Sequence, residues 1–415
     1  METERFFRRG AQKNYRLLER KFMKELKIAV YHNLPDGGAK KAIENIITGL
    51  KSRGHKVDTY SGEIFRSLGL SEKYGLNKIL LPLNLWRYKR FSQRLASKIN
   101  KGDYDVAIIT NSKILQHPYI LKYIKFPKLL ISQDPLRTVY ERNFQKNYVY
   151  RKYYRGFSRG LISLYSLFDN LIRKKPDEEN LASADGLIVN SYFSKERFLS
   201  AYGILGKVVY PGVDTTIFKP SSENKRENCI LSIGIYHVVK AHDLVIKALS
   251  LLPENKRPLL KILGFGHSSI SGMELQYLKK LRDDLGLQEK VKFEEAFFGN
   301  NIIDYYQKAY LTIATHFLEP FGFAPIESMA CGTPVVAVKE GGFRETVVDK
   351  ETGLLVERDP QELAKAILYL VEDKEAWQKF SQKGLNWVKA NFSWEAAIIK
   401  IEKELLSLMK NENRY

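Results

Sequence analysis

The sequence predicts an α/β protein of two domains, and three observations support this prediction. The chain has 415 residues, of which 44% are hydrophobic, and this length exceeds what one hydrophobic core usually organises. Apolar segments with many β-branched residues alternate with segments of helical periodicity along both halves of the chain. The apolar segments are continuous rather than interrupted by polar residues, which is typical of parallel strands covered on both faces.

The N-terminal half begins with a predicted strand, a glycine turn and a helix. Residues 27–32 (KIAVYH) form the first apolar run, NLPDGG follows as the turn, and AKKAIENIITGLKSRGH carries apolar residues at helical spacing. Further strands are predicted at VDTYS, VAIIT (106–110), KLLISQD (128–134), GLIVNS (186–191) and VVYPGVD (208–214). This alternation predicts a Rossmann-like domain over residues 1–218.

The C-terminal half resumes the same pattern. Strands are predicted at NCILSIG (228–234), LLKILGFG (259–266) and VKF (291–293), separated by helical segments such as HDLVIKALSLL. A second Rossmann-like domain is therefore predicted over residues 228–392. The polar segment at 219–227, which contains Pro220, is predicted to be the hinge between the domains.

Charge and cysteine content limit the possible partners. The formal net charge is +20, so we expect an anionic partner, which could be nucleic acid, a membrane surface or a phosphorylated substrate. The sequence has no zinc-ligand cluster, RNP-type motif or helix-turn-helix pattern, and no nucleic-acid partner is therefore expected. Cys229 and Cys331 lie far from any paired spacing, so we expect reduced thiols and no disulfide.

Targeting and metal signals are absent from the sequence. The N-terminal segment is basic but lacks the apolar run of a signal peptide, and no window approaches the ~20 apolar residues needed to cross a bilayer. A cytoplasmic location is therefore expected. Asp103-Tyr104-Asp105 has the D-x-D pattern of a metal-binding carboxylate pair, but it lies at a turn entering a strand, where Asp is a common turn residue. We expect neither a metal site nor a cofactor.

Two stretches, residues 79–99 and residues 140–175, interleave Lys and Arg with Trp, Tyr, Phe and Leu. Interfacial helices have this composition. The second stretch is predicted to be a helical insertion at about residues 140–180. Each well-placed basic side chain gains ~1 kcal/mol near anionic lipid, and aromatic side chains anchor at the interface. The alternative is an ordinary helical hairpin with a solvated basic face.

The strongest chemical signal is the segment EPFGFAPIESMACGTPVVAVKEGGFRETVVDKETGLLV, from Glu319 to Val356. Glu319 precedes a proline and is predicted to lie in a loop, whereas APIESMA is predicted to open a helix that contains Glu327. Ionised carboxylates accept hydrogen bonds from sugar hydroxyls. Glu319 and Glu327 are therefore predicted to receive hydroxyls on either side of a pyrophosphate.

Backbone groups of the same segment are predicted to complete the site. The amides of Phe323 and Ala324, at the start of the helix, would favour a phosphate group. Gly341 and Gly342 are predicted to form a second loop with exposed backbone.

This segment resembles the retaining glycosyltransferases of the GT-B fold that are called family 4, because Glu319 and Glu327 match the family's E-x7-E motif. Further landmarks occur in family order along nearly the whole chain: the glycine turn at Gly37 and Gly38, ADGLIVNS (184–191), VVYPGVDTTIFKP (208–220), SIG (232–234), LGFG (263–266) and NFSWE (391–395). The resemblance implies two Rossmann-like domains facing across a cleft, with a C-terminal helix at 393–415 that returns to the N-terminal domain.

The resemblance also implies roles for single residues. Glu319 would contact hydroxyls of the donor sugar, Glu327 would contact the ribose of the nucleotide, and Lys240 would neutralise the diphosphate. The other donor-binding residues that it implies are Gly37, Gly38, Gly264, Gly266, Phe297, Gly322, Phe323 and Ala324. Glu319, Lys240 and Gln133 are expected to act at the reacting centre.

Two positions depart from the family pattern. An arginine usually follows the SIG strand, where this chain has Ile235, and a charged hydrogen bond to phosphate is worth ~1.5 to 3 kcal/mol. Lys240, Arg344 or His237 could compensate. Many relatives have a histidine where this chain has Gln133, which can donate and accept hydrogen bonds but cannot titrate.

Two charged residues shortly after Gln133 are candidates for the acceptor side. Asp134 and Arg137 match the acidic and basic positions of an H-E-P-x-R-like variant, and they are expected to bind the acceptor. The alternative for Asp134 is that it only ends a strand.

These observations predict a metal-independent transferase of the EC 2.4 class that moves a sugar, with retention, from a nucleoside diphosphate-sugar to a glycan. The basic aromatic stretches lie in the domain that holds the acceptor in this family. A lipid-linked acceptor, surface polysaccharide or glycolipid synthesis, and peripheral attachment to the inner face of the cell membrane are therefore expected. The alternatives are a catalytically impaired nucleotide-sugar-binding or scaffold protein, motivated by Ile235 and Gln133, and a sugar-nucleotide epimerase of the same architecture.

Overall fold

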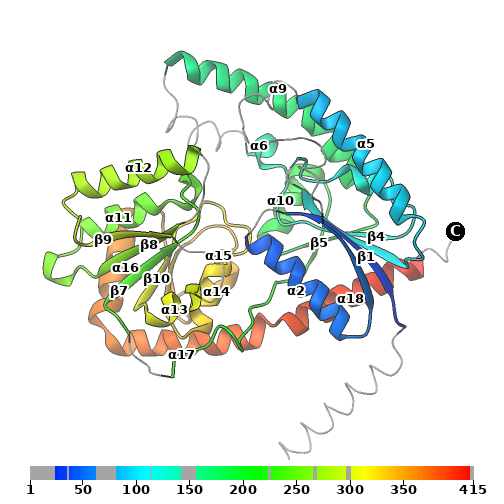
Figure 1. The fold of residues 1–415 in the computed structure, drawn as a ribbon. Coiled ribbons are helices and arrows are strands. Elements are labelled where there is room, and N and C mark those ends of the chain that lie inside the picture. The colour runs from blue at the N-terminus through cyan, green and yellow to red at the C-terminus, as the bar shows by residue number, and fades with distance from the viewer. Residues whose placement is uncertain are drawn as a thin grey trace, which may run out of the picture.

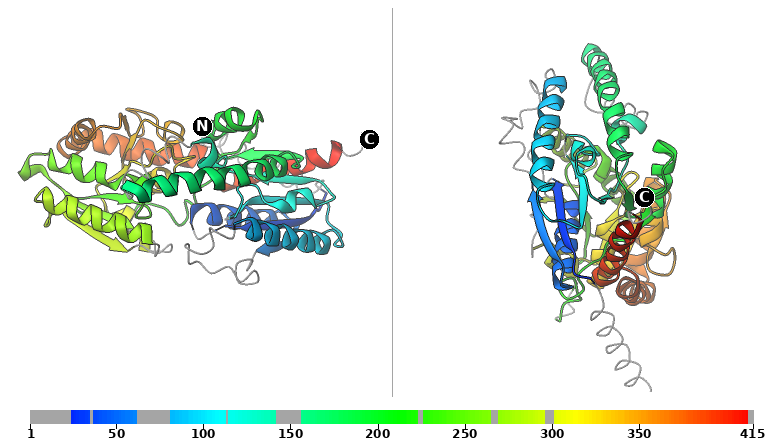
Figure 2. Two further views of the ribbon diagram at one scale, coloured as in Figure 1. Left: turned by 90° about the horizontal axis from the view of Figure 1, so that it is seen from above. Right: turned by 90° about the vertical axis from the view of Figure 1, so that its right-hand side faces the viewer.

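The computed structural model describes residues 24–34, 37–61, 81–112, 114–141, 156–222, 226–264, 269–295 and 301–411. Within these ranges the chain forms two parallel sheets, each covered by helices, in an elongated molecule of two lobes (Figures 1 and 2). No helix of the described ranges has the length and apolar character needed to cross a membrane.

The N-terminal sheet has the strand order β2-β1-β3-β4-β5-β6, and every neighbouring pair is parallel. The apolar runs predicted as strands are buried along nearly their whole length, as in β3, which agrees with a sheet covered on both faces. The strands are β1 (Lys27–Asn33), β2 (Lys56–Ser61), β3 (Val106–Ser112), β4 (Lys128–Ile131), β5 (Gly186–Val189) and β6 (Lys207–Val208).

Helices cover both faces of this sheet. Successive residues of β1 point to opposite faces: Tyr31 joins a core with α5, η1 and α10, whereas Val30 joins a core with α2 and the C-terminal helix α18. The helices of this lobe are α2 (Gly38–Ser52), α5 (Leu81–Ile99), η1 (Tyr119–Lys122), α6 (Arg137–Tyr140), α9 (Gly156–Leu181) and α10 (Tyr192–Tyr202).

The C-terminal sheet has the order β12-β11-β10-β7-β8-β9 and is also fully parallel. Its strands are β7 (Cys229–Ile233), β8 (Leu259–Gly264), β9 (Val291–Glu295), β10 (Leu311–Ala314), β11 (Val335–Val338) and β12 (Leu354–Val356). Ile230 packs with α11, whereas Leu231 and Ile233 pack with α13 on the other face.

The helices of the C-terminal lobe are short except for α12, α16 and α17. They are η3 (Val238–Lys240), α11 (His242–Ser250), η4 (Glu254–Lys256), α12 (Ser269–Asp284), α13 (Asn301–Lys308), α14 (Phe323–Ala330), α15 (Phe343–Thr346), α16 (Pro360–Glu372) and α17 (Lys374–Asn391). The alternation of strands and helices in both lobes confirms the predicted pair of Rossmann-like domains.

The chain ends with α18 (Trp394–Asn411), which crosses from the C-terminal lobe back to the N-terminal lobe (Figure 1). Ile398, Ile401 and Leu405 join the core under the N-terminal sheet. Gly49 on α2 permits this contact, because a Cβ at that position would lie 1.8 Å from Ile398 Cδ1. The predicted return of the C-terminal helix is confirmed.

Two predicted elements differ from the structure or lie partly outside it. The strand predicted at 208–214 is wrong for most of its length: β6 ends at Val208, and Pro211 has no N–H to continue the ladder. The insertion predicted at 140–175 includes part of α9 but only the last residue of α6, Tyr140, and residues 142–155 lie outside the described ranges. The domain boundaries and the 219–227 hinge stay predictions.

The two cysteines are buried and free, as predicted. Cys229 begins β7, and Cys331 follows the last residue of α14. Burial raises the pKa of Cys229 to about 11 and that of Cys331 to about 12, so neither thiol is a reactive thiolate at neutral pH.

The first testable prediction concerns His242, which is buried at the start of α11 with Nδ1 2.7 Å from Ser232 Oγ. Burial lowers the pKa of His242 to about 3, whereas an unfolded histidine titrates near pH ~6.5. The unfolded chain therefore binds one more proton between these values, and stability is lost as the pH falls from ~6.5 towards ~3, by up to ~1.4 kcal/mol per pH unit. His242→Gln should reduce this loss.

Urea unfolding between neutral pH and about pH 5 measures the effect. The free energy of unfolding of the wild type should fall more steeply with decreasing pH than that of the variant, even though the variant is less stable at neutral pH. Parallel pH profiles for the two proteins would contradict a neutral, buried His242.

Candidate functional site

The candidate site lies at the carboxyl ends of β7, β10 and β11, the edge at which parallel sheets bind ligands. The loop after β7 leads to η3 and presents Lys240, and the loop after β10 presents His316 and Glu319 before α14 begins. Because β7 and β10 are neighbours in the sheet, Lys240 and Glu319 meet although 79 residues separate them.

Glu319 and Lys240 form an ion pair at this edge. Glu319 Oε2 lies 3.1 Å from Lys240 Nζ and 3.0 Å from His316 Nδ1. Burial alone would raise the pKa of Glu319, but the charge of Lys240 holds that pKa well below its usual range. Glu319 is therefore ionised at neutral pH, as an acceptor of hydroxyl hydrogen bonds must be.

His316 is the third member of this cluster. Its Nε2 lies 2.9 Å from the carbonyl oxygen of Ile233, which can only accept, so the partners assign the hydrogen to Nε2. Burial, reinforced by the charge of Lys240, lowers the pKa of His316. The ring is therefore neutral at pH 7, and its Nδ1 accepts from the Lys240 ammonium at 3.1 Å.

The two loops that carry this cluster are held in unusual backbone conformations. Ala241 has a φ of 50° and Leu318 a φ of 45°, both in the left-handed region that non-glycine residues rarely occupy. The hydroxyl of Thr315 lies 3.0 Å from the carbonyl of Lys240, and the amide of Phe317 donates to the carbonyl of Val239 at 2.8 Å. The loops after β7 and β10 thus hold one another in place.

Arg358 fixes the same loop from the other side. Its guanidinium donates to the carbonyls of Thr315 at 2.7 Å and His316 at 3.1 Å, and it pairs with both carboxylate oxygens of Glu340 at 2.7 Å. It also lies 3.6 Å from the ring centroid of Phe317. Arg358 positions the backbone of the loop that presents His316 and Glu319.

The predicted exposed backbone at Gly341 and Gly342 is wrong. A Cβ on Gly341 would lie 2.5 Å from the carbonyl oxygen of Glu319, and one on Gly342 would lie 2.6 Å from Phe321 Cα. The amide of Gly342 donates to the Glu319 carbonyl at 2.7 Å. The glycines are needed because this turn packs against the backbone of the loop that presents Glu319.

The helix α14 begins beside this loop, after Gly322 with a φ of 105°. A Cβ on Gly322 would lie 2.7 Å from the ring of Phe343, so glycine is needed there for space as well as for backbone conformation. No side chain caps α14. Phe323 and Ala324, predicted to offer amides to phosphate, are its first two residues.

Glu327 lies on α14, and its hydrogen-bond partner differs from the residues that contact Glu319. Its Oε2 accepts from the hydroxyl of Tyr306 at 3.0 Å. Burial raises the pKa of Glu327, whereas the hydrogen bond from Tyr306 and the charge of Lys41 on α2 oppose this effect. The two predicted carboxylates therefore have separate environments, and only Glu319 forms an ion pair with Lys240.

Three predicted residues of the N-terminal lobe lie in loops or at the start of a helix, and one of them faces the C-terminal lobe. Gly38, at the start of α2, faces Phe323: a Cβ on Gly38 would lie 3.1 Å from the Phe323 ring. Gly37 precedes it with a φ of 153°. Gln133 follows β4, and its carbonyl accepts from the hydroxyl of Ser194 at 2.6 Å.

Asp134 and Arg137 belong to a cluster of charges with Glu141 and Arg197. Asp134 pairs with Arg197 and, at 3.9 Å, with Arg137, while Glu141 pairs with both arginines. Burial raises the pKa of Asp134 to about 6, against the charges of the two arginines. The charge of Glu319 in the other lobe also raises this pKa, so Asp134 lies on the side of the N-terminal lobe that faces the Lys240–Glu319 pair.

A carboxylate of the C-terminal lobe binds the start of α10 in the N-terminal lobe. Glu345 accepts from the amides of Tyr192 and Phe193, both at 2.8 Å, and from the hydroxyl of Tyr210 at 2.9 Å. Ser191, the N-cap of α10, donates to the carbonyl of Pro320 at 2.5 Å. These bonds join the two lobes next to the loop that presents Glu319.

The remaining predicted donor-site residues have different outcomes. Gly264 ends β8, where a Cβ would lie 2.1 Å from the ring of Tyr236, so it is required for packing. Gly266 and Phe297 lie outside the described residues.

Among the three cations that could compensate for Ile235, Lys240 contacts Glu319 at 3.1 Å. His237 accepts from the amide of Val239 at 3.3 Å as the cap of η3, and Arg344 donates to the carbonyl of Gly341 at 3.4 Å.

His316, Arg358 and Glu345 were not predicted from the sequence. A single histidine or arginine in a loop has no recognisable spacing, and the contact between Glu345 and α10 depends on how the lobes meet. The position of His316 three residues before Glu319 was the only available signal.

Two family models together match most of the chain. Residues 36–217 match the model described as Glycosyltransferase Family 4, and residues 213–387 match the model described as Glycosyl transferases group 1.

Sequence relatives carry one recurring name. A D-inositol 3-phosphate glycosyltransferase of Acidothermus cellulolyticus is 33% identical over 209 residues, which are 46% of this chain and 47% of that protein. A protein of the same name from Streptosporangium roseum is 28% identical over 252 residues, or 57% of this chain and 58% of that protein. The chain thus spans about half the length of these relatives.

Solved structures match over nearly the whole chain, at identities that show the fold alone. Sucrose-phosphate synthase from Thermosynechococcus elongatus has a TM-score of 0.74 at 19% identity, covering 93% of this chain and all of that one. The HepE protein of Anabaena in complex with UDP and glucose has a TM-score of 0.67 at 20% identity, covering 92% and 100%. WaaG, a glycosyltransferase involved in lipopolysaccharide biosynthesis, has a TM-score of 0.66 at 16% identity, covering 91% and 99%.

The second testable prediction concerns the contact between the lobes. Glu345→Gln replaces one carboxylate oxygen with an NH₂ group, which faces an N–H or O–H donor and cannot accept its hydrogen bond. Because charged hydrogen bonds contribute ~1.5 to 3 kcal/mol, the lobes should separate more readily. Small-angle X-ray scattering should show a larger radius of gyration, and limited proteolysis should cleave the variant faster.

Glu351→Gln is the matched control, because Glu351 is exposed and its oxygen lies 3.9 Å from Lys383 within the same lobe. It should leave both measurements unchanged. Identical scattering and cleavage for wild type and Glu345→Gln would show that this carboxylate does not hold the lobes together.

Proposed function

Because the chain belongs to the group 1 glycosyltransferases and has the GT-B fold, we propose that it transfers a sugar from a nucleoside diphosphate-sugar held at the Lys240–Glu319 pair. The observation that carries this proposal is the position of an ionised carboxylate, an ammonium and the start of α14 at one sheet edge. A diphosphate and a sugar need these opposite kinds of partner: cations and amides for the phosphates, carboxylates for the hydroxyls. The HepE structures with UDP and UDP-glucose support this donor class.

Each residue of the pair has a separate task in this proposal. Lys240 neutralises the negative charge that builds up on the leaving diphosphate. This interaction stabilises the transition state electrostatically. Glu319 accepts hydrogen bonds from the donor sugar and keeps Lys240 oriented. The neutral ring of His316 accepts from Lys240 without adding a competing positive charge.

We propose retention without a metal. The bond between the anomeric carbon and the phosphate oxygen breaks while a bond from the acceptor oxygen forms on the same face of the sugar. The acceptor proton passes to the leaving phosphate oxygen, so no protein base is required and Gln133, which cannot titrate, is tolerated. Among the described residues, no three His, Cys, Asp or Glu side chains are grouped to bind a metal.

Asp134 and Arg137 are proposed to contact the acceptor from the N-terminal lobe. Their mutual pairing with Arg197 and Glu141 would hold the Asp134 carboxylate in a fixed direction. A positioned carboxylate facing the Lys240–Glu319 pair is suited to orient an acceptor hydroxyl.

The acceptor is proposed to be lipid-linked, with the enzyme attached to the inner face of the cell membrane. Helix α5 contains five basic residues and no acidic ones, and Trp86 on it is 55% exposed. On α9, Phe168 and Leu171 are 55% and 66% exposed, with Lys174 and Lys175 also exposed. Both helices pack on η1, and they run along the same side of the N-terminal lobe (Figure 1), which would bring their apolar and basic residues to one surface.

This attachment would bring the acceptor to the enzyme within the membrane plane. We propose a role in surface glycan or glycolipid synthesis for the same reason, because the growing chains in such synthesis are carried on lipids. The solved structure of WaaG, named for lipopolysaccharide biosynthesis, has the same fold.

The third testable prediction separates donor binding from turnover. Lys240→Met should weaken binding of a nucleoside diphosphate about ten- to a hundredfold, since one charged hydrogen bond is worth ~1.5 to 3 kcal/mol. Glu319→Gln should lower turnover by about a hundredfold or more. A thermal-shift screen of nucleoside diphosphate-sugars first selects the donor, calorimetry then measures affinity, and nucleotide release with a lipid extract as acceptor measures turnover.

Lys247→Met is the matched control, because Lys247 pairs with Asp243 on α11 in the same lobe. It should change neither quantity. Full turnover by Glu319→Gln would overturn the site. Donor binding by the wild type without turnover on any lipid-linked acceptor would instead favour the nucleotide-sugar-binding scaffold.

The fourth testable prediction concerns the membrane. Replacing Trp86, Phe168 and Leu171 together by Ser should lower co-sedimentation with anionic phosphatidylglycerol vesicles by about tenfold or more, because each large apolar side chain that enters the interface contributes roughly 1.5 to 3 kcal/mol at full burial. Binding should also weaken with salt, since basic residues contribute.

Leu251 and Tyr369 are exposed apolar residues of the other lobe, and replacing both by Ser is the control. That variant should bind vesicles like the wild type. Equal vesicle binding by all three proteins would contradict the proposed membrane attachment. It would not bear on the proposed donor site.

A further inference from the structure

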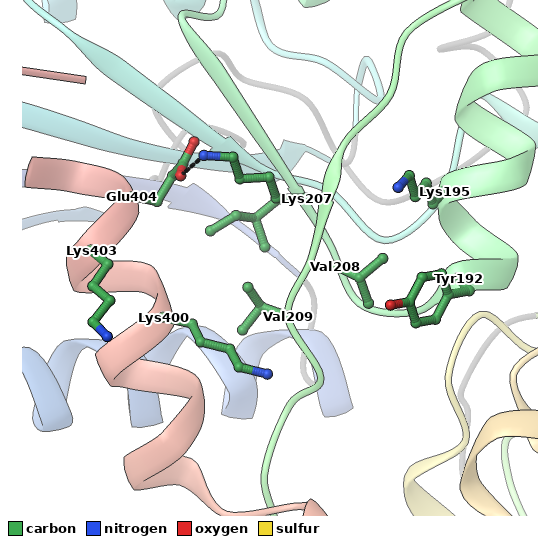
Figure 3. A pocket seen from close by; sticks show the side chains of 9 residues that line it. Tyr192, Lys195, Lys207, Val208, Val209, Lys400, Lys403 and Glu404 are labelled. Atoms are coloured by element: carbon green, nitrogen blue, oxygen red, sulfur yellow. Dashed lines mark hydrogen bonds and ion pairs between the residues drawn. The ribbon is translucent and has the colours of Figure 1, made fainter. Parts of the chain in front are cut away.

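A basic pocket lies at the edge of the N-terminal sheet, away from the Lys240–Glu319 pair. Its volume is about 400 Å³, within the range of small-ligand sites. The lining side chains come from α10, β5, β6 and α18, which are far apart in the sequence (Figure 3). Those that matter here are Tyr192, Lys195, Lys207, Val209, Lys400 and Lys403.

The pocket carries an excess of positive charge. Four lysines and one glutamate, Glu404, line it. Lys207 turns towards Glu404 and pairs with it (Figure 3). No ion pair of Lys195, Lys400 or Lys403 with a carboxylate occurs among the described residues; Lys195 instead lies 5.9 Å from the ring centroid of Tyr192. Three ammonium groups are thus left with no counterion in the described part of the chain.

The walls of the pocket are fixed by bonds that exist without a ligand. The amide of Val209 donates to the carbonyl of Val189 at 2.9 Å, so the floor is anchored to the sheet. Tyr192 is held through its own amide by Glu345 at 2.8 Å. Helix α18 is anchored by Ile401 and Leu405 in the core. The backbone that carries the lysines is therefore ordered in advance, which lowers the entropy lost on binding.

The donor site does not account for this pocket. None of the donor-binding residues identified above lines it, and the donor is assigned to the other lobe. The proposed membrane surface does not account for it either, because no residue of α5 or α9 lines the pocket, which lies at the β6 edge of the sheet between α10 and α18.

We propose that this pocket binds a phosphate group carried by a second ligand. A phosphomonoester has a charge of about −1.5 to −2 at pH 7 and three strong acceptor oxygens, which match several ammonium groups and a phenol. Lysine binds phosphate as a point charge and does not need the planar geometry of arginine. The apolar floor at Val209 and the ring of Tyr192 accommodate the organic part of the ligand. The phosphate can belong to a soluble compound or to a lipid headgroup.

The pocket adjoins the contact between the lobes. Tyr192 contributes its side chain to the pocket and its amide to Glu345, and its ring lies 6.3 Å from that of Tyr210, which in turn stacks at 6.0 Å on Phe321. Phe321 lies between Glu319 and Glu327 in the sequence. A ligand that fixes Tyr192 therefore acts on residues in direct contact with the loop that presents Glu319.

The fifth testable prediction uses the full chain with Lys240→Met, which weakens diphosphate binding at the donor site, so that the pocket is observed alone. Inorganic pyrophosphate is titrated by calorimetry at constant ionic strength. Adding Lys195→Ala and Lys400→Ala should weaken the remaining binding by at least about tenfold, because two of the three ammonium groups without counterions are removed. The exposed pair Lys374→Ala and Lys379→Ala on α17 is the control and should leave the affinity unchanged.

A second arm identifies the source of the phosphate. Flotation compares phosphatidylcholine vesicles that carry phosphatidic acid, a phosphomonoester, with vesicles that carry phosphatidylglycerol at equal surface charge. Loss of pyrophosphate binding in the Lys195/Lys400 variant supports a soluble ligand, and selective loss of phosphatidic acid binding supports a headgroup. If the control pair has the same effect as the pocket pair, or if neither pair changes either measurement, the pocket is not a phosphate site.

Because the replaced lysines lie at the surface, circular dichroism and thermal unfolding should be unchanged in both double variants. Lys403→Glu provides an independent check without removing Lys195 or Lys400. It should also weaken pyrophosphate binding, since it places a carboxylate in the pocket.

Discussion

The ion pair between Lys240 and Glu319 is the interaction on which the rest of the candidate site depends. Both side chains are largely buried, at 20% and 23% exposure, and removing one partner of a buried pair is costly because the other charge is left without compensation. The pair forms only if the loops after β7 and β10 adopt the left-handed conformations at Ala241 and Leu318, each of which costs ~1 to 3 kcal/mol. Thr315, Arg358 and the turn at Gly341 hold these loops in place, so the surrounding structure stabilises a strained backbone that presents two opposite charges.

The same pair would allow the proposed donor site to work without an arginine at Ile235. A cation next to the donor phosphates must be fixed in direction to be effective, because a mobile lysine loses rotamer entropy on binding. Lys240 is fixed by two acceptors, Glu319 and the neutral His316. A positively charged histidine at this place would repel Lys240, whereas the neutral ring accepts its hydrogen bond. Burial therefore keeps His316 neutral, and the neutral ring helps to orient Lys240.

The sequence was sufficient for the architecture but not for the contacts that assemble the site. Continuous apolar runs predicted both parallel sheets, and the segment from Glu319 to Glu327 predicted a loop that carries Glu319, followed by a helix that contains Glu327. The spacing of the two glutamates could not show that Glu327 bonds Tyr306, because Tyr306 lies on α13 and the two meet only after the helices pack. Arg358, Glu345 and His316 were missed for the same reason. The glycine pair at 341 and 342 was recognised as special, but a sequence cannot distinguish backbone that is exposed from backbone that is closely packed.

The distribution of charge separates the proposed donor site from the surfaces that are proposed to meet other partners. Around the donor site the charges balance: Lys240 pairs with Glu319, Arg358 with Glu340, and Asp134 and Glu141 with two arginines. A single diphosphate there cannot account for a net charge of +20. Within the described residues, part of the positive excess lies on α5, which has no acidic residue, and around the lysine pocket beside α18. Because α5 and α18 cover opposite faces of one sheet, a flat anionic surface that touches α5 does not reach the lysines of α18, and the two proposals therefore call for separate anionic partners.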